Sequence, residues 1–206
     1  MRRYELGKAP WWSLFFILLL GCGGVYAEVK PARAAVASAH PLATEAGHQI
    51  LDDGGNAFDA AVAVSAVLAV VEPYSSGLGG GGFWLLHRAS DGFETMVDGR
   101  ERAPLAAHRE LYLDESGEVI PGLSINGPLA AGIPGEPAAL AHIAQRYGRL
   151  PLKQVLRPAI RLAREGFPVD SHYRRMATWR KDQLLESAAA QEIFLTHGKV
   201  PDSAAP

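Results

Sequence analysis

A dense charge cluster follows a predicted strand, and one of its members could bind an anion. The cluster lies in the segment 98–104 and contains Asp98, Arg100, Glu101 and Arg102. The planar guanidinium of Arg100 can hold a carboxylate with two parallel charge-assisted hydrogen bonds, which makes this arginine a candidate anion clamp. The same side chains could instead form a solvated salt-bridge cluster with no ligand, and the local pattern leaves both interpretations open.

A glycine-rich segment at 77–82 precedes this cluster and satisfies the dinucleotide-binding pattern G-x-G-x-x-G by count. That fingerprint needs a strand before the glycines and a helix after them. Here the predicted order is reversed, and no Gly-Lys-Ser/Thr follows, so a phosphate-binding loop is excluded as well. The glycines indicate a loop whose backbone takes positive φ or lies very close to another group.

No nucleophile with a base, and no metal site, can be assembled from the sequence. The seven histidines are dispersed, and none belongs to an H-E-x-x-H motif. Ser75 and Ser76 precede the glycines without a G-x-S-x-G motif, so we interpret them as hydrogen-bonding loop residues. The net charge is −2 and no basic run is interleaved with aromatic residues, which argues against a nucleic-acid partner.

Residues 1–27 have the order of a secretory signal peptide. Basic residues at 2, 3 and 8 precede an apolar run at 11–20, and Val-Tyr-Ala at 25–27 has the small-x-small form of a signal-peptidase site. The run is half as long as the ~20 residues that a membrane-spanning helix needs. We therefore expect an exported protein, periplasmic or extracellular.

A second kind of processing is compatible with the same segment. Leu-Leu-Gly-Cys at 19–22 is similar to a bacterial lipoprotein box, in which Cys22 would carry a lipid anchor. Cys22 is the only cysteine, so cleavage after Ala27 would leave a mature chain without disulfides. After a flexible lead at 28–35, residues 36–206 are expected to form one folded part.

Two helices open this part. Residues 40–53 carry apolar side chains on one helical face, and Gly54-Gly55 ends the pattern. Asn56 is a favourable N-cap for a second helix at 57–71, which is apolar on nearly all sides and therefore predicted to be buried.

The rest of the chain predicts a hairpin and further helices. Apolar and alternating runs at 83–88 and 93–98, separated by a turn, indicate a β-hairpin. Helical periodicity returns at 136–147 and 150–165, where Pro158 either breaks the second helix or begins a shorter one. After Asp170 the chain is polar and helical in pattern.

Taken in order, these segments resemble the γ-glutamyltransferase (glutathione hydrolase) family, specifically the N-terminal part of its large subunit. The resemblance spans residues 34–170, and its specificity lies in the order and spacing of segments that are individually weak. The matching segments are 36–44, 51–63, 77–83, 98–104, 132–135 and 158–167.

The resemblance implies an α+β fold, the αββα sandwich of N-terminal-nucleophile hydrolases, incomplete in this chain. It implies a proenzyme that cuts itself into a large and a small subunit. The N-terminal threonine of the small subunit then attacks γ-glutamyl amides such as glutathione, with its own α-amine as the base. Water or an amino acid takes the γ-glutamyl group, and no cofactor is required.

One functional position carries over from the family. The arginine of the Arg-Glu-x-Ala-Pro segment, here Arg100, would bind the α-carboxylate of the glutamyl group. Gly99 stands where some members have an aromatic residue. No catalytic residue can be placed, since Thr178 and Thr196 are internal and lie in no matching motif. The chain alone is therefore expected to be inactive without the small subunit.

Three alternatives remain at this stage. A cephalosporin-acylase-like enzyme or an enzyme that processes poly-γ-glutamate would keep the fold and change the substrate. A non-catalytic exported binding protein would follow if the gene ended at Pro206. For the isolated chain we expect aggregation, because a two-stranded hairpin is marginal by itself and the apolar helix at 57–71 would lack its full cover.

Overall fold

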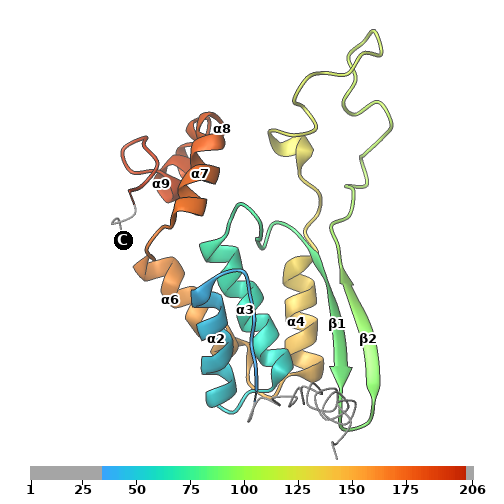
Figure 1. Ribbon diagram of the computed structural model, residues 1–206. Helices are drawn as coiled ribbons and strands as arrows, with labels where there is room; N and C mark the ends of the chain where they lie inside the picture. The colour runs from blue at the N-terminus through green and yellow to red at the C-terminus, as the bar shows by residue number, and fades with distance from the viewer. Residues whose placement is uncertain (1–33, 203–206) are drawn as a thin grey trace, which may run out of the picture. The chain divides into compact units, whose positions relative to one another are not determined.

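The computed structural model describes residues 34–202 (Figure 1). The described residues from 35 onward belong to one compact unit. The predicted signal peptide at 1–27, the lipoprotein box at Cys22 and the lead up to residue 33 lie outside the described residues. Within 34–202, the helices are all too short or too polar to cross a membrane.

The described chain contains helices and one hairpin in the predicted order. The elements are α2 (Pro41–Asp52), α3 (Ala57–Val71), β1 (Gly82–Arg88), β2 (Phe93–Gly99), the 3-10 helix η1 (Pro128–Ala130), α4 (Glu136–Tyr147), α5 (Leu152–Val155), α6 (Arg157–Glu165), α7 (Ser171–Trp179), α8 (Lys181–Leu185) and α9 (Ala188–Phe194).

Helix α3 is the centre of the helical packing and contacts α2, α4, α5 and α6 (Figure 1). Its N-cap prediction is confirmed, because the Asn56 side chain accepts hydrogen bonds from the backbone N–H groups of Phe58 and Asp59. The Asp59 carboxylate in turn accepts a hydrogen bond from the Asn56 N–H, which completes a capping box. Small residues in α3 allow the neighbouring helices to approach closely, and its buried apolar residues are Ala60, Val62, Ala63, Ala66, Val67 and Val71.

Strands β1 and β2 pair antiparallel (Figure 1). Helix α4 contacts β2. Alternation along each strand places Leu86 in the core beside Ile143 of α4, with Trp84 and Val97 packed against the same cluster. The opposite face is apolar but open, since Leu85 is directly across from Met96 and both are exposed. One face of the hairpin thus supports the helices while the other remains uncovered among the described residues.

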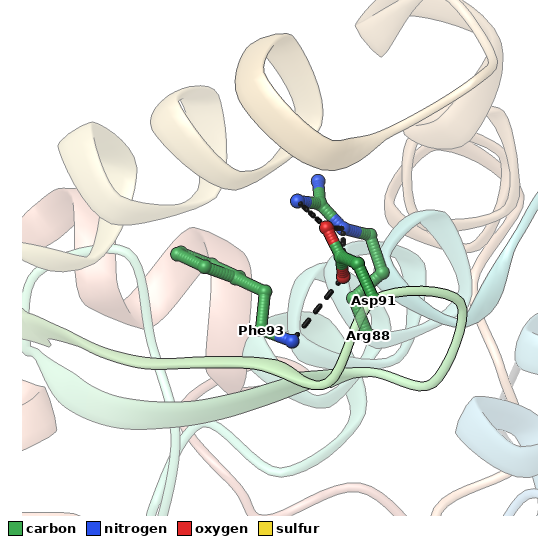
Figure 2. A network of polar contacts seen from close by, with 3 residues as sticks. All are labelled: Arg88, Asp91 and Phe93. Carbon is green, nitrogen blue, oxygen red and sulfur yellow. Dashed lines mark hydrogen bonds and ion pairs between the residues drawn. The ribbon is translucent and has the colours of Figure 1, made fainter.

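A short polar network closes the hairpin turn (Figure 2). Nε and Nη2 of the Arg88 guanidinium donate three charge-assisted hydrogen bonds to the carboxylate of Asp91, which also accepts one from the Phe93 N–H at 3.2 Å. The guanidinium also lies 5.0 Å from the centre of the Phe93 ring. These bonds hold the pKa of Asp91 below its usual value, chiefly through Arg88. The turn therefore sets the register of the two strands locally.

The segment 105–134 has little regular structure, although Arg102 and Ile133 pair their backbones at its base. Pro158 lies in the first turn of α6, so the predicted helix at 150–165 is two helices that meet at Leu156. Asp170 caps α7 by accepting a hydrogen bond from the Tyr173 N–H at 2.7 Å. The polar C-terminal part is helical, as predicted.

Candidate functional site

Arg100 directly follows β2, where the chain leaves the hairpin. Its backbone N–H donates to the Asp98 carboxylate at 3.0 Å, so the aspartate holds the main chain and not the guanidinium. The Arg100 side chain is 64% exposed, and its Nη1 lies 3.4 Å from Oε2 of Glu101. Of the salt bridges that the charge cluster at 98–102 could form, the described residues therefore show one, the long ion pair between Arg100 and Glu101.

A hollow of about 520 Å³ lies beside this arginine. One wall is the glycine-rich loop after α3, and the opposite wall carries Arg100, Glu101 and Glu136. Ser75 and Ser76 also line it, which places the two serines near the charged groups but gives them no histidine partner among the described residues. A guanidinium that opens into a polar hollow can hold the carboxylate of a small ligand.

Two carboxyl groups, those of Glu101 and Glu136, line the hollow together with Arg100. Burial raises the pKa of Glu136, and the nearby Glu101 raises it further. Oε2 of Glu101 is shielded from solvent but accepts no hydrogen bond within residues 34–202, so its contact with Arg100 is electrostatic. No hydrogen bond from the Arg100 guanidinium occurs within that same range, which leaves its planar donor edges available for a ligand.

Two glycines near the site, Gly81 and Gly135, are needed for space, and none of the glycines from 77 to 82 has positive φ. A Cβ atom on Gly81 would overlap the carbonyl oxygen of Gly99 and come within 2.9 Å of the Glu101 nitrogen. A Cβ atom on Gly135 would overlap the same carbonyl and lie 2.6 Å from the oxygen of Arg100. Of the two alternatives the sequence offered, very close approach is therefore correct.

Gly99 itself faces the interior. A Cβ atom there would lie 2.6 Å from both the Ala139 side chain and the Trp84 ring. The space that a side chain at 99 would enter is already filled by Trp84 and α4. This accounts physically for glycine at a position where the resemblance allows an aromatic residue.

Backbone hydrogen bonds join the walls of the hollow. The carbonyl of Gly80 accepts bonds from the N–H groups of Gly135 and Glu136, each at 3.1 Å. Arg102 and Ile133 exchange two more, at 3.1 and 2.8 Å. The start of α4 is thereby fixed against both the glycine-rich loop and the charged segment, which explains why Glu136 shares the hollow with Arg100.

Glu136 is the site residue that sequence reasoning missed. Its signal was available, since it follows the Pro134-Gly135 pair that opens α4. Thr178 and Thr196 have local structural roles: the Thr178 hydroxyl donates to the Arg174 carbonyl at 2.7 Å, and Thr196 pairs its backbone with Lys199. Within residues 34–202, no three His, Cys, Asp or Glu side chains converge as metal ligands.

A second hollow of about 430 Å³ is lined mainly by apolar side chains of α7, α8 and α9. Tyr74 lines both hollows and packs against His172 and Tyr173, with ring centres 4.9 and 6.0 Å away. Burial raises the pKa of Tyr74 to about 12, with Glu72 and Asp170 adding to the shift. This hollow lacks the paired acid and base groups seen around Arg100, so the polar hollow is the better candidate site.

Comparison with known proteins defines first the class and then the family. The described chain is similar to γ-glutamyltranspeptidase from Helicobacter pylori, with a TM-score of 0.79 and 37% identity over 84% of this chain and 50% of that one. It is also similar to cephalosporin acylase from Bacillus halodurans, with a TM-score of 0.69 and 31% identity over 85% of this chain and 36% of that one. The predicted class is thereby confirmed as part of an α+β N-terminal-nucleophile hydrolase fold.

The family follows from the sequence comparison. The family model described as gamma-glutamyltranspeptidase matches residues 43–205. The glutathione hydrolase proenzyme of Bacillus subtilis strain 168 is 41% identical over 165 residues, which are 80% of this chain and 28% of that protein. The chain belongs to the γ-glutamyltranspeptidase family and spans less than a third of the length of this curated relative.

Proposed function

We propose that this chain forms part of a glutathione hydrolase proenzyme and that Arg100 holds the α-carboxylate of the γ-glutamyl donor. The observation that carries the proposal is the placement of Arg100, which lines a polar hollow and, among residues 34–202, makes one ion pair, at 3.4 Å with Glu101. A guanidinium fork suits a carboxylate better than a lone cation does, because it donates two parallel hydrogen bonds.

The chemistry would be completed by a part of the protein outside this chain. A small subunit from the same proenzyme would supply an N-terminal threonine, whose hydroxyl attacks the γ-carbonyl while its α-amine accepts the proton. The protonated α-amine returns the proton to the leaving-group nitrogen as the amide C–N bond breaks, and water or an amino acid then takes the γ-glutamyl group from the threonine ester. Residues 34–202 would contribute donor binding to this sequence of steps, and export would place the enzyme in the periplasm or outside the cell.

The kinetic test uses the complete proenzyme, with residue 100 altered. Arg100→Ala is expected to raise the donor KM by roughly 10- to 1,000-fold, since each charge-assisted hydrogen bond contributes ~1.5–3 kcal/mol and ~1.4 kcal/mol is a factor of ten. The donor KM of Arg100→Lys should lie between those of the parent and Arg100→Ala, because lysine keeps the positive charge but lacks the planar fork of donors. Self-cleavage into subunits should survive, since it uses no free donor.

The sharpest control is a change of substrate. A γ-glutamyl anilide carries the α-carboxylate, whereas a 4-aminobutyryl anilide has the same scissile bond and the same amine but no α-carboxylate. The parent enzyme should strongly prefer the first, and Arg100→Ala should abolish most of that preference. Arg102→Ala removes a neighbouring arginine that does not line the hollow and should change little. A donor KM within about threefold of the parent in a processed Arg100→Ala enzyme, a shift of roughly 0.65 kcal/mol, would refute the clamp.

The same substrate panel separates the alternatives within the fold. Turnover of a cephalosporin side chain or of poly-γ-glutamate in preference to glutathione would support those readings, which keep the anion clamp. The absence of both self-cleavage and turnover in the full-length gene product would instead support an exported binding protein.

A further inference from the structure

We propose that Gly81 and Gly135 are positioning residues that set the location of Arg100 in the hollow. This inference rests on the proposed function, because it concerns the same arginine. The two glycines come from different segments, one from the loop after α3 and one from the start of α4. Both lie against the backbone of 99–101, where the charged segment begins.

Gly81 and Gly135 both lie very close to the backbone of Gly99 and Arg100. The Gly99 carbonyl oxygen occupies the space where a Cβ atom of either glycine would stand. The Cβ positions at 81 and 135 are also within 3.0 Å of Arg100 itself, of its carbonyl carbon and its oxygen respectively. Real Cβ atoms do not come this close to backbone atoms, so any side chain at either position must displace the segment that carries the guanidinium.

Glycine is required here for space and not for its conformational freedom. The backbone of Gly135 has φ −103° and ψ −21°, a conformation that alanine adopts readily. Gly81 likewise does not have a positive φ angle. Alanine at these positions would carry no intrinsic backbone strain, so its effect reports the displacement of residues 99–101.

The two clamping segments are also tied to each other. The Gly80 carbonyl accepts the N–H groups of Gly135 and Glu136, so the loop and the helix start cannot separate without breaking two hydrogen bonds. The Arg102–Ile133 pair closes the arrangement on the other side of Arg100. The backbone of Arg100 is therefore enclosed by the loop at 80–81, by Ile133 and by the start of α4 at 135–136. Its side chain still lines the hollow.

A milder version of the same contact exists at Gly132. Its Cβ position is 3.0 Å from the Glu101 Cβ and 3.3 Å from the Arg102 carbonyl oxygen. These neighbours need to yield by only a few tenths of an ångström. Gly132→Ala should therefore shift the segment less than Gly81→Ala or Gly135→Ala, and it remains informative if a stronger variant fails to fold.

The test measures donor kinetics of the complete, self-processed proenzyme. Gly81→Ala and Gly135→Ala are expected to raise the KM for a γ-glutamyl anilide by about 10-fold or more, near the ~1.4 kcal/mol of one decade. Gly132→Ala should raise it by a few-fold. Turnover of the 4-aminobutyryl anilide, which lacks the α-carboxylate, should fall much less, because the glycines act through Arg100.

A glycine in the same loop provides the control for the methyl group itself. No heavy atom lies within 4 Å of a Cβ added at Gly79, so Gly79→Ala lines the hollow with a methyl and leaves 99–101 in place. It should raise the donor KM less than Gly81→Ala does. An equal or larger effect at Gly79 would mean that the methyl acts by filling the hollow, which overturns the inference.

A double-mutant cycle separates positioning from general stability. In an Arg100→Ala background, adding Gly135→Ala or Gly132→Ala should change the donor KM by less than about twofold, because the clamp through which they act is gone. Additive losses, or equal losses on both anilides, would overturn the positioning role while leaving the Arg100 clamp intact. An Arg100→Ala enzyme with the parent's KM would instead remove the proposed function itself.

Discussion

Asp59 and Arg149 are 90 residues apart in sequence, yet Oδ2 of Asp59 accepts a hydrogen bond from the backbone N–H of Arg149 at 2.9 Å. The same carboxylate accepts the Asn56 N–H at 2.9 Å and a longer contact from the Leu150 N–H at 3.5 Å. Asp59 is fully buried. It therefore joins the start of α3 to the chain that leaves α4.

The first prediction concerns that buried carboxylate. Asp59→Ala should lower the free energy of unfolding by about 1–3 kcal/mol for each buried donor it leaves unpaired, or several kcal/mol in all. Asp59→Asn should cost less, because it keeps one acceptor oxygen. Urea unfolding followed by circular dichroism measures both. The exposed Asp52→Ala serves as control and should stay within about 0.5 kcal/mol of the parent.

The second prediction tests the glycine beneath the same carboxylate. A Cβ atom at Gly148 would overlap Oδ1 of Asp59 and lie 2.5 Å from the Ala144 carbonyl oxygen. Gly148 has φ −70°, so alanine is unstrained there and packing alone decides the outcome. Gly148→Ala should destabilise the chain by about 1–3 kcal/mol. In an Asp59→Ala background its cost should shrink by at least ~0.5 kcal/mol, and strict additivity would contradict the contact.

The third prediction concerns the pH dependence of stability at Glu136. Burial, and to a lesser extent the nearby Glu101, raise its pKa in the folded state above the usual value for a glutamate. A raised carboxyl pKa means that the folded state holds the proton more tightly, so stability rises as pH falls through the folded pKa. Glu136→Gln removes this contribution from the curve of melting temperature against pH.

The comparison between parent and Glu136→Gln is therefore made across that range. As the pH falls through the raised pKa of Glu136 toward the ordinary glutamate pKa of about 4.3, the parent should gain more stability than the variant, because only the parent takes up the proton at this position. Glu165→Gln, an exposed carboxylate at the end of α6, is the matched control. Parallel curves for the parent and Glu136→Gln would show that the hollow does not perturb this group.

The fourth prediction concerns self-association of the isolated chain. The open face of the hairpin exposes Phe83, Leu85 and Met96 by 58, 83 and 59%, and Leu85 is directly across from Met96. Contiguous exposed apolar side chains on edge strands favour aggregation. Leu85→Ser should increase the soluble monomer seen by size-exclusion chromatography. Leu105→Ser, an exposed leucine away from the strands, should have a smaller effect.

Local signals were enough to place most of the elements. The apolar run at 57–71 and the cap at Asn56 predicted α3 with the bounds that the structure has. The helix at 136–147 and the hairpin were predicted to within one residue. These elements depend on residues close in sequence, through capping, periodicity and turn chemistry, so the sequence contains their causes directly. Local signals marked Arg100 only as a candidate, by its type and its place after a strand, and the family resemblance suggested its role as a ligand for a carboxylate.

The surroundings of Arg100 depended on the tertiary structure. Glycine in a sequence indicates conformational freedom, whereas Gly81 and Gly135 are needed because the Gly99 carbonyl fills their side-chain space. Glu136 became a site residue because two backbone bonds to Gly80 bring the start of α4 to the glycine-rich loop. Sequence by itself determined which groups could act and which elements carry them. Only the path of the folded chain decided which groups meet, because contacts between distant segments depend on packing that no local pattern records.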